Sequence, residues 1–454
     1  MRLVPIEIEP AGPRLRVLWL STIAFTILFA VWLMLGVLGL EMKKDATLML
    51  GDAAAGMSAE TIKVEVQRRF EWVLAVAILA GSILRLNFGI WADRYGGRNM
   101  MVLLLFLTAV PTYWLAHASS YTELLICAAL FGLAGNSFTV GISWCSAWFS
   151  EQRKGTALGV FGAGNVGASG TKILVILIPS LLTLVPAAGL LGGLIPGGWR
   201  VVPVFYTVLL VAMAVTLLLA CPRVDRKPGR GRPMAEMLAP LQYIRVWRFS
   251  LYYVVVFGAY VALSAWLPDY YRTNYLADWP QQDGVRMAAL LTALFIFPAC
   301  LLRPLGGYLS DRFGPRVVTY SMFGLMTVAT IPLCLPATVL SLSVTGFATL
   351  LFLVGVGMGI AKASVYKYVP NYFPNDVGAV GGLVGMLGAL GGFILPKVFG
   401  VLGRTTGVPQ AAFIALLAIT LASLVWLHVV VMRIKAKERA AERVAEPELV
   451  PQAV

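Results

Sequence analysis

Long apolar runs dominate the chain, and short polar segments separate them. Each run reaches about 20 residues, the length that an α-helix needs to cross a hydrocarbon layer roughly 30 Å thick. The pattern predicts an all-α membrane protein with twelve transmembrane helices. We expect them at residues 16–40, 71–91, 99–118, 122–149, 155–180, 201–221, 249–272, 286–309, 317–336, 345–370, 377–400 and 410–432.

One polar break divides the pattern into two sets of six. The segment CPRVDRKPGRGRP is basic and rich in proline and glycine, so it cannot be a span. We therefore expect an N-terminal six-helix bundle (1–222), a basic cytoplasmic linker (223–248), a C-terminal six-helix bundle (249–433) and a cytoplasmic tail (434–454).

A repeated stretch supports this division. The sequences GSILRLNFGIWADRYGGR and ACLLRPLGGYLSDRFGPR align when the first, which ends at Arg98, is shifted by 218 positions to end at Arg316. The repeat indicates a duplicated protein with pseudo-symmetric halves. The aligned pairs are Arg85 with Arg303, Gly89 with Gly307, Asp93 with Asp311, and Arg94 with Arg312.

The first arginine of each copy lies inside an apolar run. It stands eight residues before the aspartate near the helix end, which places it about 12 Å deep. An arginine at such depth costs at least about 3 kcal/mol and almost always faces a polar interior. No carboxylate occurs at comparable depth to pair with Arg85 or Arg303. Equal depth in both halves therefore indicates a central site for an anion.

A second repeat consists of glycines. In GTALGVFGAGNVGASG and GAVGGLVGMLGALGG, residues Gly155, Gly159 and Gly162 align with Gly378, Gly382 and Gly385. Spacings of three and four place them on one helix face. They either admit a neighbouring helix closely or expose backbone to a ligand, and the sequence leaves both roles open.

The charged residues of the chain indicate how the protein is oriented in the membrane. The net charge of +14 would suggest a nucleic-acid partner for a soluble protein. Here the positive residues cluster in the linker and the tail, which the positive-inside rule assigns to the cytoplasm. Both termini should then be cytoplasmic, although the basic and acidic loop 41–70 argues weakly the other way.

This topology predicts that cysteines placed in residues 226–240 react with a thiol reagent only from the cytoplasmic side. Labelling of these positions from outside intact cells would overturn the predicted orientation.

The motif G-x3-D-R-[YF]-G-x-R, at 89–98 and 307–316, resembles the signature loop of the major facilitator superfamily. The resemblance implies two six-helix bundles that rock around a central site. A charge network at these helix ends would latch one state; the alternative is a solvated loop that only sets orientation. The gating candidates are Asp93, Arg94, Arg98, Asp311, Arg312 and Arg316.

Within that superfamily the chain resembles the nitrate/nitrite porters, through Arg85, Arg303 and the stretch GVFGAGNVGASG. The resemblance implies that the two arginines bind substrate and that Asn165 belongs to the nitrate signature. Nitrate is a small planar anion, and a guanidinium meets oxyanions with a planar fork of donors. Further binding candidates are Gly162 and Gly164 in this stretch and Gly385 in its repeat.

Two residues in the later spans distinguish this chain from the better-known branch of the family. Leu263 stands near the place where the better-known branch of the family has a tyrosine, so Tyr260 becomes a candidate lining residue. Lys362 lies near the midplane of the span 345–370 and resembles the branch that takes up nitrate with protons. It is the only midplane titratable group besides the arginines, so it is a candidate proton carrier. A permanently charged lysine that only attracts the anion is the alternative.

The sequence predicts a monomeric secondary transporter in the bilayer of a bacterial inner membrane, with nitrate as substrate and nitrite as a second candidate. No ATP-binding motif is present, so the energy must come from an ion or exchange gradient. The resemblance to the branch that takes up nitrate with protons makes protons the expected coupling ion. We expect no enzymatic activity, cofactor, metal or nucleic-acid partner. The alternatives are a nitrate/nitrite antiporter, a porter of another small anion, a passive anion channel and a membrane sensor with a transporter fold.

Overall fold

A computed structural model describes residues 11–169, 185–186, 189–336, 339–408 and 410–445. The all-α prediction is confirmed, and the described residues contain no β-strand. Eleven described helices are long and apolar enough to cross a membrane. The remaining predicted span, 155–180, begins as α9 and the 3-10 helix Gly164–Ser169, and the rest of it lies outside the described residues.

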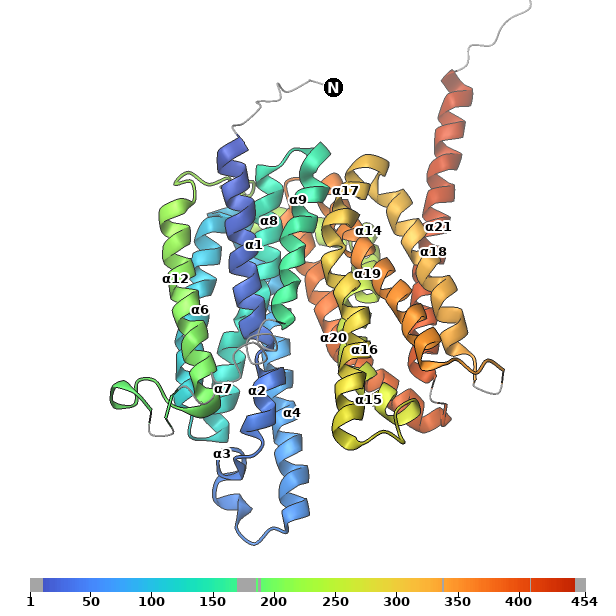
Figure 1. Ribbon diagram of the computed structural model, residues 1–454. Helices are drawn as coiled ribbons and strands as arrows, with labels where there is room; N and C mark the ends of the chain where they lie inside the picture. Colours follow the sequence, from blue (N-terminus) through green and yellow to red (C-terminus); the bar gives the residue numbers. More distant parts are fainter. Residues whose placement is uncertain (1–10, 170–184, 187–188, 337–338, 409, 446–454) are drawn as a thin grey trace, which may run out of the picture.

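The helices form two groups that stand side by side (Figure 1). The first group contains α1 (Ala11–Leu33), α2 (Leu35–Met42), α3 (Ala46–Leu50), α4 (Ala59–Ile83), α5 (Arg85–Tyr95), α6 (Gly97–His117), α7 (Tyr121–Phe131), α8 (Ser137–Trp148), α9 (Glu151–Ala163) and α12 (Val201–Ala220). After α13 (Met234–Leu238), the second group contains α14 (Ile244–Tyr253), α15 (Ala259–Asn274), α16 (Gln281–Leu301), α17 (Arg303–Phe313), α18 (Pro315–Cys334), α19 (Val344–Tyr372), α20 (Val377–Thr406) and α21 (Ala411–Ala445).

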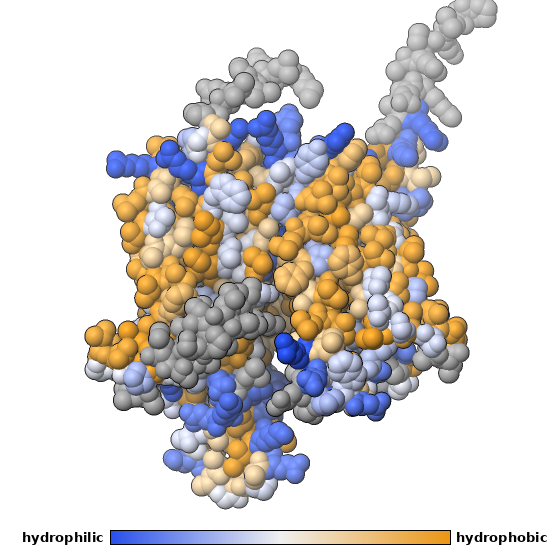
Figure 2. All heavy atoms as spheres, viewed as in Figure 1, coloured by the Kyte–Doolittle hydropathy of each residue, from blue (hydrophilic) through white to orange (hydrophobic). Residues whose placement is uncertain are grey.

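The surface has the apolar middle of a membrane protein. Figure 2 shows a belt of apolar side chains between two more hydrophilic ends. The start of α1 and the end of α21 lie at the same end of the molecule (Figure 1). We call this end the linker face, because Asp225, in the segment that follows α12, docks there on the backbone N–H of Arg98, at 2.9 Å.

Two spans that were expected to be continuous are broken directly before the buried arginines. The backbone leaves helical geometry at Leu84 (φ −82°, ψ 0°) and again at Leu302 (φ −84°, ψ 4°). In α17 the break has a covalent cause, because Pro304 has no N–H to donate. In α5 the Arg85 side chain donates through Nε to the Gly81 carbonyl at 2.9 Å, and so occupies the i−4 acceptor of its own backbone.

The repeated glycines bring the two groups into close contact. A Cβ atom on Gly159 of α9 would lie 2.5 Å from the backbone oxygen of Arg303 in α17. A Cβ atom on Gly382 of α20 would lie 2.8 Å from the backbone oxygen of Arg85 in α5. Helices of opposite halves thus meet, backbone to backbone, beside each arginine. The close-approach role of these glycines is confirmed.

Gly159→Ala should therefore destabilise the protein and slow transport. The added carbon has no room against the backbone, and overpacking of this kind costs about 1–3 kcal/mol. Thermal unfolding and transport assays compare it with Gly324→Ala on α18, where a Cβ would meet nothing within 4 Å. Equal behaviour of the two variants would show that the α9–α17 contact is not tight.

Candidate functional site

Arg85 and Arg303 are both completely buried where the two groups of helices meet. Arg85 donates through Nη1 to the Gly385 carbonyl at 3.0 Å, in addition to its bond to Gly81, but its Nη2 has no partner. None of the three guanidinium nitrogens of Arg303 has a hydrogen-bond partner. A buried charge normally has a counter-charge and a full set of hydrogen bonds. The described part of the chain places no carboxylate in ion-pair range of either arginine.

Aromatic rings surround the two guanidinium groups. The ring centroid of Phe138 in α8 lies 5.8 Å from Cζ of Arg85 and 5.2 Å from Cζ of Arg303. The rings of Trp32 and Phe257 lie 5.3 and 5.9 Å from Cζ of Arg85. Ring faces attract cations and exclude water, but they do not neutralise charge. The unpaired guanidinium nitrogens of both arginines are therefore donors that an anion could use.

The predicted glycines Gly162 and Gly385 lie directly against these arginines. A Cβ on Gly162 would come within 2.6 Å of Cζ of Arg303, and one on Gly385 would lie 2.7 Å from the hydroxyl of Tyr366. Any side chain here would fill the space beside the guanidinium groups. Gly164 has a different place, since a Cβ there would meet Phe25 of α1 at 2.6 Å.

Asn165 is buried, and neither its amide nitrogen nor its amide oxygen has a partner. It belongs to the 3-10 helix Gly164–Ser169, which packs against α1. An unpaired buried amide is costly, so Asn165 is suited to bind a polar ligand.

Lys362 adds a third buried cation. It lies in α19, its Nζ is 3.2 Å from the ring centroid of Tyr260, and it donates to the Ala299 carbonyl at 3.0 Å. The ring of Phe257 lies 5.9 Å from Nζ of Lys362 and from Cζ of Arg85. The structure thus joins Lys362 and Tyr260 to the arginine site through one shared aromatic ring.

Besides Trp32, four more aromatic residues of this site were missed at the sequence level. Phe138 stacks on Tyr253 and Phe257, and Tyr366 stands edge-on to Phe138 at 5.0 Å. Aromatic residues occur in most spans of this chain. Nothing in their spacing separates these four from residues that face lipid.

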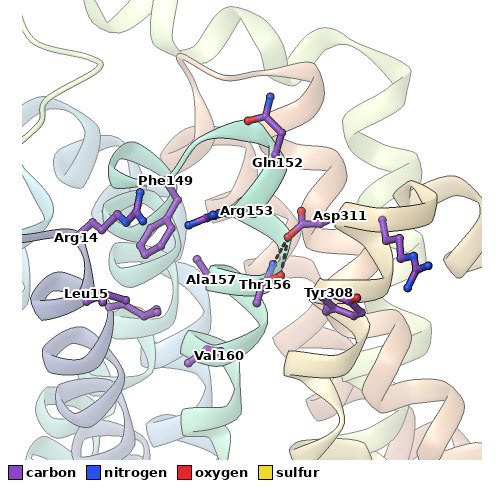
Figure 3. Close-up of a pocket in the computed structure, with 12 residues that line it drawn as sticks. Arg14, Leu15, Phe149, Gln152, Arg153, Thr156, Ala157, Val160, Tyr308 and Asp311 are labelled. Atoms are coloured by element: carbon purple, nitrogen blue, oxygen red, sulfur yellow. Dashed lines mark hydrogen bonds between the residues drawn. The ribbon is translucent and has the colours of Figure 1, made fainter. Parts of the chain in front are cut away.

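Asp311 connects the two halves at the linker face. Its carboxylate accepts a hydrogen bond from the backbone N–H of Gly155 at 2.8 Å. It also accepts from the backbone N–H of Thr156 at 2.7 Å and from the Thr156 hydroxyl (Figure 3). It also pairs with Lys367 of α19 at 2.8 Å. Lys367 is buried and also donates to the carbonyl of Glu151. Lys367 therefore points into the protein and not towards solvent.

Asp93 makes the corresponding contact from the other half. It accepts from the Ser143 hydroxyl at 2.5 Å and from the backbone N–H of Gly378, at the start of α20, at 2.8 Å. Gly155 and Gly378 are aligned in the glycine repeat. Each aspartate thus binds amide groups at the start of a helix in the opposite half, where the helix dipole favours negative charge. We call these two sets of contacts the aspartate latches.

The four arginines of the signature loops have other neighbours. Arg98 donates to the Leu218 carbonyl at 2.7 Å. Arg94 and Arg312 lie over the rings of Tyr95 and Phe313, next to them in sequence. Arg316 is half-buried at the start of α18.

The end opposite the linker face is hollow. A cavity of about 420 Å³ lies between α4 of the first group and α15 and α20 of the second. Arg68, Trp72 and Lys397 are among the residues that line it. We call this cavity the vestibule: it lies between the halves at one end, whereas the aspartate latches join them at the other.

Known proteins match this sequence and this fold. The sequence profile of the Major Facilitator Superfamily matches residues 20–396 and again 284–452. A Thermus thermophilus protein named "Probable nitrate/nitrite antiporter NarK1" is 54% identical over 449 residues, which is 96% of each chain. The "Nitrite extrusion protein" of Bacillus subtilis is 29% identical over 78% of this chain and 84% of its own length.

Solved structures share the architecture at low identity. The fucose:proton symporter of E. coli has a TM-score of 0.69 and 16% identity, over 92% of this chain and 99% of its own. A proton:xylose symporter has a TM-score of 0.69 and 12% identity, over 92% and 96%. The twelve-helix fold with two pseudo-symmetric bundles is thereby confirmed.

Proposed function

Because the chain belongs to the nitrate/nitrite porter family of the major facilitator superfamily, we propose that it carries nitrate across a membrane, with nitrite as a second substrate. One observation carries this proposal. Two guanidinium groups, one from each half, are buried around the ring of Phe138, and no carboxylate of the described residues pairs with either. The names of the Thermus and Bacillus relatives support the choice of substrate.

In the proposed mechanism, nitrate lies between the forks of Arg85 and Arg303 and takes the hydrogen bonds that are now missing. Gly162 and Gly385 leave the room for it, the ring of Phe138 limits its position, and Asn165 lines the path. The bundles 1–222 and 249–433 each supply one arginine, so a rocking motion carries the anion from one side to the other.

The orientation follows from the basic linker. We place residues 223–248 and both termini in the cytoplasm of a bacterium, with the protein in the inner membrane as a monomer. The linker face is then cytoplasmic, and the described arrangement is closed towards the cytoplasm by the aspartate latches. The vestibule beside Arg68 and Lys397 then faces outward.

Asp311→Asn should weaken the cytoplasmic closure. It removes the ion pair with Lys367, and loss of one partner from a buried pair costs about 3–5 kcal/mol. A cysteine at Ala379, which is fully buried on α20 beside the other latch, should then react faster with a membrane-permeant thiol reagent. Asp52→Asn, an exposed position, serves as the control; an unchanged rate in Asp311→Asn would remove this aspartate from the gate.

Energy coupling needs a second ion. Nitrate entry into a cell that is negative inside is opposed by about 2.3 kcal/mol per 100 mV. We propose symport with protons through Lys362, since burial disfavours a charged lysine and a bound anion favours it. The second candidate is exchange of nitrate for nitrite, which the name of the Thermus relative favours.

Uptake into proteoliposomes distinguishes these functions. Symport predicts that an inward proton gradient drives nitrate accumulation, whereas an antiporter requires nitrite inside. A channel would show no counterflow, and a sensor would bind nitrate without flux. A porter of another anion would leave nitrate uptake at the level of empty liposomes, which would refute the proposal.

A further inference from the structure

A second basic cavity lies at the linker face, on the outer wall of the protein. It has a volume of about 510 Å³ and lies between α1 and α9 of the first group and α17 of the second. It is separate from the buried arginine site. Three arginines line it. Arg312 belongs to the second signature loop, whereas Arg14 and Arg153 take part in neither the proposed anion pathway nor the latches.

The walls of this cavity combine positive charge with apolar surface. Figure 3 shows the side chains of Arg14 and Arg153 extending towards each other beside Phe149, with Tyr308 on the opposite wall. No carboxylate forms an ion pair with either arginine among the described residues. Asp311 also borders the cavity, but Lys367 and the α9 backbone already take its charge.

The cavity opens towards the membrane. Leu15 and Tyr308 in its lining are 43% and 50% exposed, and the neighbouring Trp19 on α1 is 56% exposed. Such apolar surface on a membrane-spanning helix faces lipid chains. Arg14 lies near the start of the first span, at the level where lipid headgroups lie. A ligand that fits must be negative at one end and apolar along the rest.

We propose that this cavity binds an anionic phospholipid of the cytoplasmic leaflet, whose phosphate lies between Arg14 and Arg153 and whose acyl chain passes Leu15 and Val160. Arginine binds phosphate oxygens bidentately. The cytoplasmic leaflet is the one rich in anionic lipid, so the proposal rests on the cytoplasmic orientation of the linker face.

The binding has a consequence for transport. Both halves build the cavity, so it exists in this form only while α9 and α17 are together. A ligand that binds one arrangement shifts the population towards it. Anionic lipid should therefore stabilise the protein in the arrangement that is closed at the linker face.

The test uses purified full-length protein in nanodiscs of phosphatidylcholine, with or without phosphatidylglycerol. Phosphatidylglycerol should raise the thermal unfolding midpoint of the wild type and bind as adducts in native mass spectrometry. Both effects should be lost in the double variant Arg14→Ala/Arg153→Ala. They should persist in Arg223→Ala/Arg230→Ala, which removes two exposed positive charges from the same face.

Further variants and a soluble phosphate compound distinguish a lipid site from other causes of the stabilisation. Val160→Trp fills the apolar part and should also lose the effect, while Arg14→Lys/Arg153→Lys should retain most of it. Equal loss in both alanine pairs would reduce the effect to general surface charge and overturn the site. Equal stabilisation by soluble glycerol 3-phosphate, which has no acyl chain, would show a free phosphate site instead. These results do not depend on nitrate transport, so they fail or succeed independently of the proposed substrate.

Discussion

Arg85→Lys and Arg303→Lys should each reduce nitrate uptake to near the level of empty liposomes. Lysine keeps the charge but loses the planar fork of donors. One lost hydrogen bond to a charged group costs about 1.5–3 kcal/mol, which is a factor of about 10 to 100 in affinity. The initial rate of nitrate uptake as a function of concentration measures this loss.

The two arginines should not be equivalent. Arg85 already donates to two backbone carbonyls, whereas Arg303 has every guanidinium nitrogen unpaired. Arg303 therefore has more donors to give to the anion, and its replacement should weaken nitrate binding more. Arg223→Lys, on the exposed linker, is the matched control. Unchanged nitrate affinity in either site variant would show that its arginine is not a direct ligand.

Lys362→Gln should abolish proton-driven accumulation of nitrate while nitrate exchange down its own gradient survives. Glutamine keeps an N–H donor on a side chain one atom shorter than that of lysine, but it cannot gain and lose a proton. The measurement is nitrate uptake with and without an imposed proton gradient, next to nitrate counterflow in the same vesicles.

Lys63→Gln, at an exposed position in α4, removes one lysine without touching the site and should accumulate nitrate as the wild type does. If Lys362→Gln also continues to accumulate nitrate with the proton gradient, Lys362 is not the proton carrier. Nitrate/nitrite exchange would then become the leading mechanism.

The features that the sequence predicted well are those with a strong local or repeated signal. Apolar runs fix the spans because their length must match the bilayer. The repeated stretch singled out Arg85 and Arg303 as a matching pair. The structure places the aligned glycines beside these arginines. A feature that occurs twice at equal spacing can be recognised without any knowledge of contacts.

The features that it missed depend on contacts between distant segments. The breaks at Leu84 and Leu302 were not expected, because the hydrophobic pattern continues across them. Phe138 lies beside both arginines, yet it reads as one more apolar residue of its span. The ion pair between Lys367 and Asp311 was not expected, because the two residues lie 56 positions apart in sequence.

The most direct test of the central claim is an experimental structure determined with nitrate. We predict one planar density between Arg85 and Arg303, within hydrogen-bond distance of the Arg303 guanidinium and beside the ring of Phe138, which is absent without nitrate. Nitrate bound elsewhere, with both guanidinium groups unoccupied, would contradict the account.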